Sequence, residues 1–199
     1  MNGLAQIFRK LSLPIKTGQT TSYGSGAGLD DGAVQPGETP AFVVLSTGQY
    51  SGTTNITINS KTDAHSNNVV YCVNNHRMYS RYVSASVGPT SNGLLPWTTN
   101  ANGEGVFTYA AAARAANLAG HNDWRPANAK ELIDLMNYEA PTAVPDTTAF
   151  PTFPASTVWS STTQPNVTAN AMRADYNSGG MANGIAKTNT GYCLLVRVP

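Results

Sequence analysis

Hydrophobic and polar residues alternate at a spacing of two in several short stretches of this chain. The alternation predicts β-strands, because successive side chains of a strand point to opposite faces of a sheet. It is clearest at residues 55–59, Asn-Ile-Thr-Ile-Asn. The strands that we expect are 41–45, 55–59, 68–73, 171–176 and 193–198.

Two stretches have the spacing of helices instead. The first runs from Thr108, an expected N-cap, through an alanine-rich segment to Gly120 as the residue after the helix. The second begins with Asn128 as N-cap and Glu131 three residues later, the spacing of a capping box. The apolar positions that we expect to face inward from it are Leu132, Leu135 and Met136. Strands, two helices and then strands again predict an α+β fold.

Glycine and proline divide the rest into long loops, at residues 14–41, 86–105 and 141–154. We expect Trp97 to anchor the second of these loops by packing. Residues 1–13 have apolar side chains at the helical spacing Leu4, Ile7, Phe8 and Leu11. We therefore predict an N-terminal amphipathic arm, residues 1–13, packed on the domain or on another copy in a homo-oligomer, and a single domain, residues 14–199.

Composition and charge argue against several classes of binding partner. Only 12% of the residues are charged, the net charge is +1, and lysine and arginine are scattered singly. A nucleic-acid-binding protein usually carries a basic stripe, so we expect no nucleic-acid partner. No apolar run reaches about 18 residues, so we expect no membrane insertion. The N-terminal segment also lacks the apolar region and cleavage site of a signal peptide.

The chemistry-bearing residues do not form a recognisable catalytic or metal-binding motif. His65, His76 and His121 are scattered, without the spacing of metal ligands. Cys72 and Cys193 could pair or remain two buried thiols, and the lack of a signal peptide favours thiols. The turn Asp30-Asp31-Gly32 lacks the alternating ligands of a calcium loop, so we expect a surface turn. We accordingly expect no enzyme activity, no metal and no cofactor.

The segment Asp123-Trp124-Arg125 precedes the second helix and looks structural. We expect Asp123 and Arg125 to hydrogen-bond loop backbone around a buried tryptophan. The hydroxyl groups of residues 160–163 are likewise expected to satisfy neighbouring backbone rather than to catalyse a reaction.

Four segments in order carry a family resemblance: LPIKTGQTTSY (Leu13–Tyr23) with the Asp-Asp-Gly turn, ANLAGHNDWRPANAKELIDLM, VWSSTT, and the closing VR. The chain resembles the Lcl carboxy-terminal domain family over nearly its whole length. The resemblance implies a C-type-lectin-like fold, with a small twisted antiparallel sheet, two helices and a loop-rich face that binds a ligand.

The same fold carries the variable proteins of diversity-generating retroelements, such as phage tropism determinants. In that group the C-terminal strand and loops hold the varied positions, and the last part of this chain is rich in asparagine. Binding residues carried over from this resemblance are Arg173, Asp175, Asn177, Met181, Asn183, Lys187, Asn189 and Tyr192.

The chain departs from the family pattern in three places. Residues 74–79, Asn-Asn-His-Arg-Met-Tyr, replace a segment that usually holds tryptophan. This change either brings these residues into the binding face or reflects altered packing, and we favour packing. The leucine usually found between Arg125 and Pro126 is missing, and no tryptophan lies near Met172.

The expected function is binding without catalysis, by a receptor-recognition protein at a viral tail tip or cell surface whose target is a host-surface protein or glycan. The alternative is a bacterial surface adhesin of the same fold that binds glycans. An enzyme related to sulfatase activators is disfavoured, because those enzymes use a cysteine pair near the chain end and only Cys193 lies there.

Overall fold

The computed structural model describes residues 16–17, 19, 21–22, 30–34 and 37–199. The predicted arm, residues 1–13, lies outside the described residues, as do most positions of the Leu13–Tyr23 segment. The predicted turn at Asp30 is the start of α2 (Asp31–Val34), a single helical turn. Asp30 Oδ1 accepts a hydrogen bond from the Ala33 N–H at 3.1 Å, as an N-capping carboxylate does. Within the described part of the chain, no helix has the length and apolar character needed to cross a membrane.

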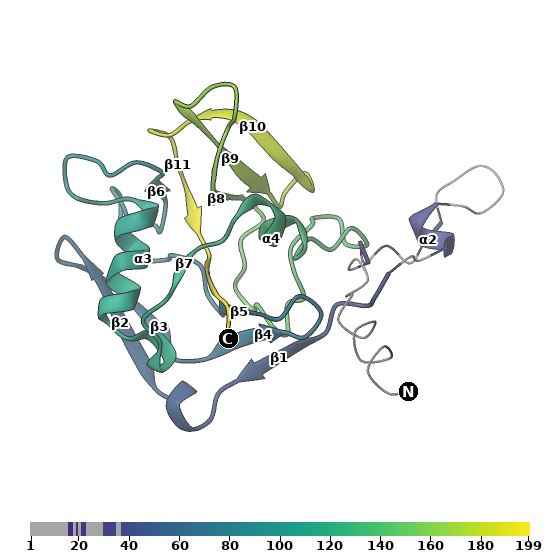
Figure 1. The fold of residues 1–199 in the computed structure, drawn as a ribbon, viewed down its shortest axis with the longest axis horizontal. Helices are drawn as coiled ribbons and strands as arrows, with labels where there is room; N and C mark the ends of the chain where they lie inside the picture. The colour runs from purple at the N-terminus through teal and green to yellow at the C-terminus, as the bar shows by residue number, and fades with distance from the viewer. Residues whose placement is uncertain (1–15, 18, 20, 23–29, 35–36) are drawn as a thin grey trace, which may run out of the picture.

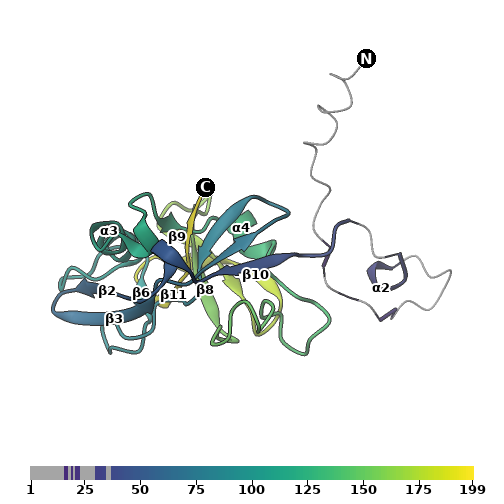
Figure 2. The same ribbon diagram turned by 90° about the horizontal axis from the view of Figure 1, so that it is seen from below.

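One half of the molecule is a five-stranded antiparallel sheet with the order β1–β4–β5–β12–β7 (Figure 1). Its strands are β1 (Phe42–Leu45), β4 (Val69–Cys72), β5 (Arg77–Ser80), β12 (Leu195–Arg197) and β7 (Arg125–Pro126). The predictions at 41–45 and 68–73 are therefore confirmed to within about one residue. β1 is an edge strand, and it extends along the side of the body toward α2 (Figure 2).

A second five-stranded sheet has the order β10–β9–β8–β11–β6. Its strands are β10 (Gly180–Ala186), β9 (Asn170–Asp175), β8 (Thr157–Thr163), β11 (Thr190–Cys193) and β6 (Leu95–Pro96). All pairs are antiparallel except β11 with β8, which run parallel. A separate hairpin joins β2 (Thr53–Ile58) to β3 (Lys61–Ser66) after a short 3-10 turn, Gly48–Tyr50.

The strand predicted at 193–198 is divided. β11 ends at Cys193 and β12 begins at Leu195, so the chain leaves the second sheet and enters the first at Leu194 (Figure 1). All three residues are fully buried. The apolar residues at the start of the predicted strand thus mark a passage of the chain through the interior between two sheets.

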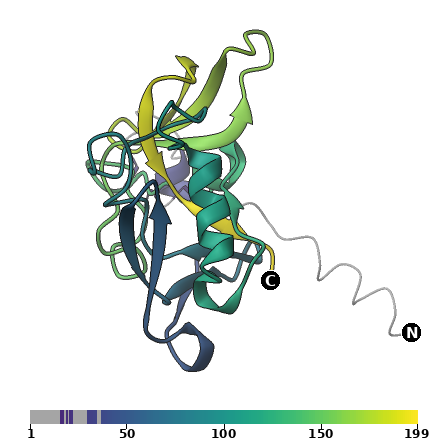
Figure 3. The same cartoon turned by 90° about the vertical axis from the view of Figure 1, so that its left-hand side faces the viewer.

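The first predicted helix is shifted toward the N-terminus. α3 (Val106–Ala115) begins after Gly105, and Thr108 lies inside its first turn, donating from Oγ1 to the Gly105 carbonyl at 2.9 Å. The early start buries Val106 fully. The helix ends before Asn117, whose φ of 55° is left-handed, a conformation that asparagine tolerates. Gly120 instead closes a short 3-10 turn, Leu118–Gly120, and α3 lies beside the β2–β3 hairpin (Figure 3).

The second predicted helix is confirmed at its start and is shorter than expected. In α4 (Ala129–Ile133), Asn128 Oδ1 accepts from the Glu131 N–H, and Glu131 Oε2 accepts from the Asn128 N–H, each at 2.9 Å. The inward positions are buried as predicted: Leu132, Leu135 and Met136.

Ion pairs fix the segment that leads into α4, and they differ from the prediction. Arg125 donates to both carboxylate oxygens of Glu131, at 2.8 and 2.6 Å, and Arg77 Nε adds a third contact at 3.1 Å. Asp123 pairs with Arg197 of β12 at 2.7 Å. Asp123 and Arg125 therefore bind charged side chains more than loop backbone, because the fold brings oppositely charged groups within reach that are distant in sequence.

Two apolar clusters fill the interior. One contains Trp124 and Trp159 and packs around α3, while the other contains Tyr79, Phe150 and Tyr176. Cys72 and Cys193 are both buried free thiols, so the second of the two alternatives for them is confirmed.

Residues 74–79 form the turn between β4 and β5 and the start of β5. Met78 and Tyr79 are buried in the interior, whereas His76 is exposed and its Nδ1 lies 2.8 Å from the Tyr71 hydroxyl. Met78 and Tyr79, the last two residues of this segment, therefore contribute to packing.

Candidate ligand-binding surface

Arg173 and Asp175 lie on one side of the second sheet. Paired residues of neighbouring strands point to the same face, and Arg173 pairs with Trp159 of β8 and Ala182 of β10. The Arg173 guanidinium carbon lies 5.8 Å from the centroid of the Trp159 ring. Trp159 is fully buried, and its indole N–H donates to the Leu95 carbonyl at 3.0 Å. The arginine thus lies over a ring that burial and a hydrogen bond hold in place.

Arg173 retains an unused hydrogen-bond donor. Its Nε is buried and has no hydrogen-bond partner among the described residues. Asp175 is engaged in the β9–β10 turn, where it accepts from the Ser178 hydroxyl at 2.8 Å and the Asn177 N–H at 3.0 Å. These bonds, the one from Ser178 foremost, hold the pKa of Asp175 below its usual value.

A second cation lies on the same side of the sheet. Lys187 Nζ is 4.0 Å from the centroid of the Trp97 ring and donates to Thr163 Oγ1 at 3.1 Å. Thr163 pairs with Ala171, two residues before Arg173 on β9, which places both cations on one side. Trp97 is fixed by its indole N–H, which donates to the Ser160 carbonyl at 2.8 Å, so it anchors its loop as predicted.

Met181 and Tyr192 lie on the opposite side. Met181 pairs with the buried Ala174, and Tyr192 pairs with the buried Val158. Both are partly buried against the cluster that contains Tyr176. The eight predicted binding residues therefore do not share one face, because Met181 of β10 and Tyr192 of β11 point to the side opposite Arg173.

The remaining predicted residues lie in turns or are incompletely described. Asn177 and Asn189 are exposed in the turns that follow β9 and β10. Asn183 lies in β10, but its side chain is outside the described part of the structure.

Tyr192 borders a hollow that the sequence did not predict. The hollow has a volume of about 240 Å³ and is lined by Asp63, Ala64, Tyr82, Val83, Ser84, Ala85, Asn92, Thr152, Pro154 and Tyr192. It brings β3 and the loops before β6 and β8 next to β11. Residues more than a hundred positions apart in the sequence thus form one concave site.

Asp63 is the polar centre of this hollow. Its Oδ2 accepts from the Tyr109 hydroxyl at 2.9 Å and the Ala85 N–H at 3.0 Å, and lies 3.1 Å from His65 Nε2. Asp63 is only 2% exposed. Burial raises the pKa of Asp63, but the contacts with His65, Ala85 and Tyr109 outweigh burial and lower it. The group is therefore an ionised carboxylate at neutral pH.

The signal for this site was weak in the sequence. In the segment Lys-Thr-Asp-Ala-His-Ser, Asp63 and His65 occupy alternate positions. These are the two positions of β3 that face inward. A strand with polar residues at its buried positions indicates an internal hydrogen-bond network, but nothing local identifies the partners Tyr109 and Ala85.

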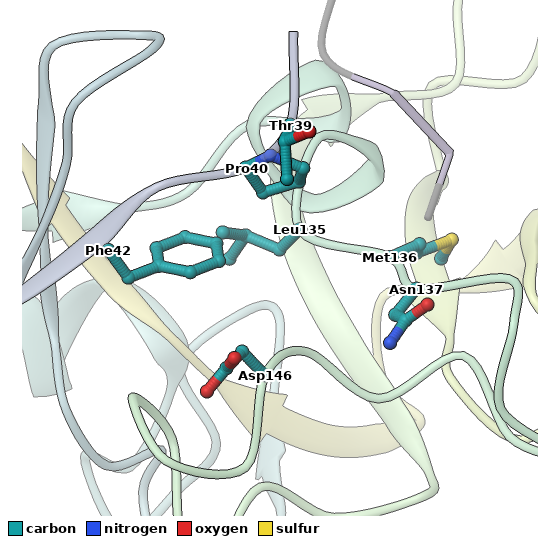
Figure 4. A pocket seen from close by; sticks show the side chains of 7 residues that line it. All are labelled: Thr39, Pro40, Phe42, Leu135, Met136, Asn137 and Asp146. Carbon is teal, nitrogen blue, oxygen red and sulfur yellow. The ribbon is translucent and has the colours of Figure 1, made fainter. Parts of the chain in front are cut away.

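A second hollow, of about 190 Å³, lies beside edge strand β1. In Figure 4 one wall comes from Thr39, Pro40 and Phe42, another from residues 135–137, and the third from Asp146. Asp146 Oδ1 accepts from the N–H groups of Thr148 and Ala149, at 2.8 and 2.9 Å. The hollow is mainly apolar, and its one carboxylate already caps a turn.

The described side chains that could hold a metal ion are dispersed. Among the described residues, no three or more histidine, cysteine, aspartate and glutamate side chains gather in a way that could hold a metal ion. Burial raises the pKa of both the Cys72 and Cys193 thiols, which makes them poor nucleophiles. His121 is partly buried, and its Nε2 has no hydrogen-bond partner in the described structure.

Comparison with known families gives a match over more than half of the chain. The family model of the Lcl C-terminal domain matches residues 87–197, a range that contains the Asp-Trp-Arg segment, the Val-Trp-Ser-Ser-Thr-Thr segment and the closing Val-Arg. The Leu13–Tyr23 segment lies outside it, so the match is shorter than the resemblance expected from the sequence. No curated protein and no solved structure gives a significant match to the chain.

Proposed function

Because the chain belongs to the Lcl C-terminal domain family, we propose that it is a non-enzymatic binding domain that presents a ligand-recognition surface on a rigid frame. We include in the proposal a C-type-lectin-like frame. The two short helices, the separate small sheets and the long loops support that assignment. So does the position of β12, which inserts the end of the chain between β5 and β7.

The observation that carries the proposal is the pair of cations stacked on fixed tryptophans. Arg173 lies over Trp159, and Lys187 lies over Trp97, on one side of the second sheet. Each indole N–H is bonded to backbone, so both rings hold their cations in place before any ligand arrives. Groups ordered in advance lose less conformational freedom on binding, and this increases affinity.

The surroundings of these cations suit recognition more than catalysis. Exposed asparagines in the neighbouring turns, Asn177 and Asn189, provide adaptable hydrogen bonds, as polar residues do in antibody binding loops. Affinity at one such site is modest, and display of several copies increases it.

We further propose that this surface varies between related proteins, as in the variable proteins of diversity-generating retroelements, and that the domain acts in receptor recognition at a viral tail tip or a cell surface. The asparagine-rich segment from Asn166 to Asn189 supports this. Sequencing of the surrounding locus tests it. We expect a reverse-transcriptase gene and a near-copy of the final codons of this gene, with adenines at the varied positions. A locus without both contradicts the variable-protein proposal.

The binding function itself is tested with the chain displayed on multivalent particles. We would measure binding to arrays of glycans and of cell-surface proteins, with and without calcium. Arg173→Ala and Lys187→Ala are compared with Asn102→Ala, an exposed position in the turn before α3. We expect a ligand whose binding the first two changes reduce and the third does not. A glycan ligand would favour the adhesin alternative, and equal binding by all three variants would contradict the proposed surface.

A further inference from the structure

Asp63 is the only charged residue among those that line the hollow beside Tyr192. The other lining residues are apolar, aromatic, hydroxyl-bearing or amide-bearing. The carboxylate is held almost out of water, and its contacts on Oδ2 with His65, Ala85 and Tyr109 stabilise the ionised form. A cationic ligand group in the hollow is attracted by this charge, whereas a neutral ligand is not.

One oxygen of the Asp63 carboxylate is available to a ligand. Each of the contacts that Asp63 makes within the described residues, to Tyr109, Ala85 and His65, ends on Oδ2. Oδ1 therefore has no donor there, although Asp63 lines the hollow. The contacts at Oδ2 fix the carboxylate, so Oδ1 is a positioned acceptor.

Aromatic rings complete the surroundings. Tyr82 and Tyr192 line the hollow from two different segments and are both partly exposed. Tyr82 is held edge-on to His65, with ring centroids 6.2 Å apart and an angle of 80° between the rings. Tyrosine rings attract cations, which adds to the attraction of the carboxylate.

Size restricts the ligand further. A volume of about 240 Å³ is below the roughly 300–1,000 Å³ of pockets for drug-sized molecules. It suits one extended side chain better than an oligosaccharide. The rim is formed by exposed loop residues such as Asn92 and Thr152, so a group projecting from another protein can reach it.

We propose that this hollow binds a primary ammonium group, and that its natural occupant is a lysine side chain of a protein partner. The ammonium donates to Asp63 Oδ1, and its alkyl chain lies along Tyr82 and Tyr192. The inference rests on the proposed binding function and specifies the chemistry of one anchor, on the opposite side of the second sheet from Arg173.

The test uses the full chain and two small probes, N-acetyl-lysine N-methylamide and N-acetyl-norleucine N-methylamide. The second probe is similar but lacks the ammonium group. Binding is followed by NMR chemical shifts on titration. We expect the lysine probe to shift the backbone signals of residues 63–64, 82–85 and 192, and the norleucine probe to leave them unchanged. Equal shifts with both probes, or shifts elsewhere only, would overturn the proposal.

Two variants locate the contact. In Asp63→Asn the amide oxygen can keep the Oδ2 contacts while an NH₂ group replaces Oδ1, so we expect affinity for the lysine probe to fall about tenfold or more. Thr152→Trp starts from an exposed position at the rim and obstructs the hollow with Asp63 intact. It should also abolish binding, and it decides the matter if Asp63→Asn fails to fold. Unchanged binding by either folded variant contradicts the site.

Two further outcomes separate this inference from the proposed function. If methyl glucoside binds in the hollow and the lysine probe does not, the ammonium assignment is wrong while the domain remains a binding protein. If the lysine probe binds but Arg173→Ala and Lys187→Ala leave the array ligand unaffected, the surface in the proposed function is wrong and the ammonium site stands.

Discussion

Glu131 shows how single residues stabilise this fold. It is 5% exposed and contacts two guanidinium groups, from Arg125 and Arg77, while also accepting the Asn128 N–H. Removal of the carboxylate charge leaves two guanidinium groups, 33% and 38% exposed, without their counter-ion. The same carboxylate therefore supports α4, β5 and β7 together.

We expect Glu131→Gln to lower the free energy of unfolding by about 2–3 kcal/mol, because two arginines lose their counter-ion. Urea denaturation measures this. The matched control is Asp123→Asn, which removes an ion pair whose carboxylate side chain is 50% exposed. We expect that control to cost less than about 1 kcal/mol. Equal losses in the two variants would show that the Glu131 contacts are no stronger than a surface pair.

Glu131 also predicts a pH dependence. Burial raises its pKa, but Arg125, the Asn128 N–H and Arg77 outweigh burial and lower it. A lowered pKa in the folded state contributes stability that is present above the unfolded value, near 4.3, and is lost as the pH falls through the folded value. We expect the stability of the wild type to decrease in this acidic range and that of Glu131→Gln to decrease less. Parallel pH curves would contradict this assignment.

At the scale of elements, the loop from Ser84 to Gly93 connects the two sheets. The Ser84 hydroxyl donates to the Gly93 carbonyl at 2.6 Å and accepts from the Cys193 N–H at 3.0 Å. The same loop directs the Ala85 N–H at Asp63. Gly93 has a φ of 81°, and a Cβ there would lie 2.2 Å from the Ser84 carbonyl oxygen.

Gly93→Ala should therefore destabilise the protein by about 2 kcal/mol or more, through left-handed strain together with a backbone clash. Gly103→Ala is the matched control, since Gly103 has a φ of 77° but no atom within 4 Å of the added Cβ. The control should cost about 1 kcal/mol. Thermal unfolding of both variants checks this, and a similar loss in both would show that the close approach to Ser84 has no effect.

Elements were predictable where local pattern and burial agree. Residues 55–59 alternate cleanly and lie almost entirely in β2, and the Asn128–Glu131 spacing correctly marked the start of α4. β3 was missed because its inward residues include Asp63 and His65, which the alternation rule counts as outward. The start of α3 was misplaced because burial of Val106, a tertiary effect, determines it.

At the scale of the molecule, β11 and β12 tie the proposed binding surface to the frame. The chain leaves β11 beside β8 and continues into β12 between β5 and β7 (Figure 1). Arg173 and Lys187 could be selected from the sequence because they lie in the segment after Trp159. The tryptophans beneath them and the hollow around Asp63 depend on contacts between distant segments, which spacing along the chain cannot reveal.

The central claim is that this frame carries a binding surface centred on two stacked cations. The most direct measurement compares multivalent wild type with Arg173→Ala and Lys187→Ala, recording array binding and melting temperature for each. Arg173 and Lys187 are both partly exposed, so we predict at least about tenfold weaker binding with little change in melting temperature. Binding equal to wild type would contradict the proposed surface. A large fall in melting temperature would show that these cations support the fold.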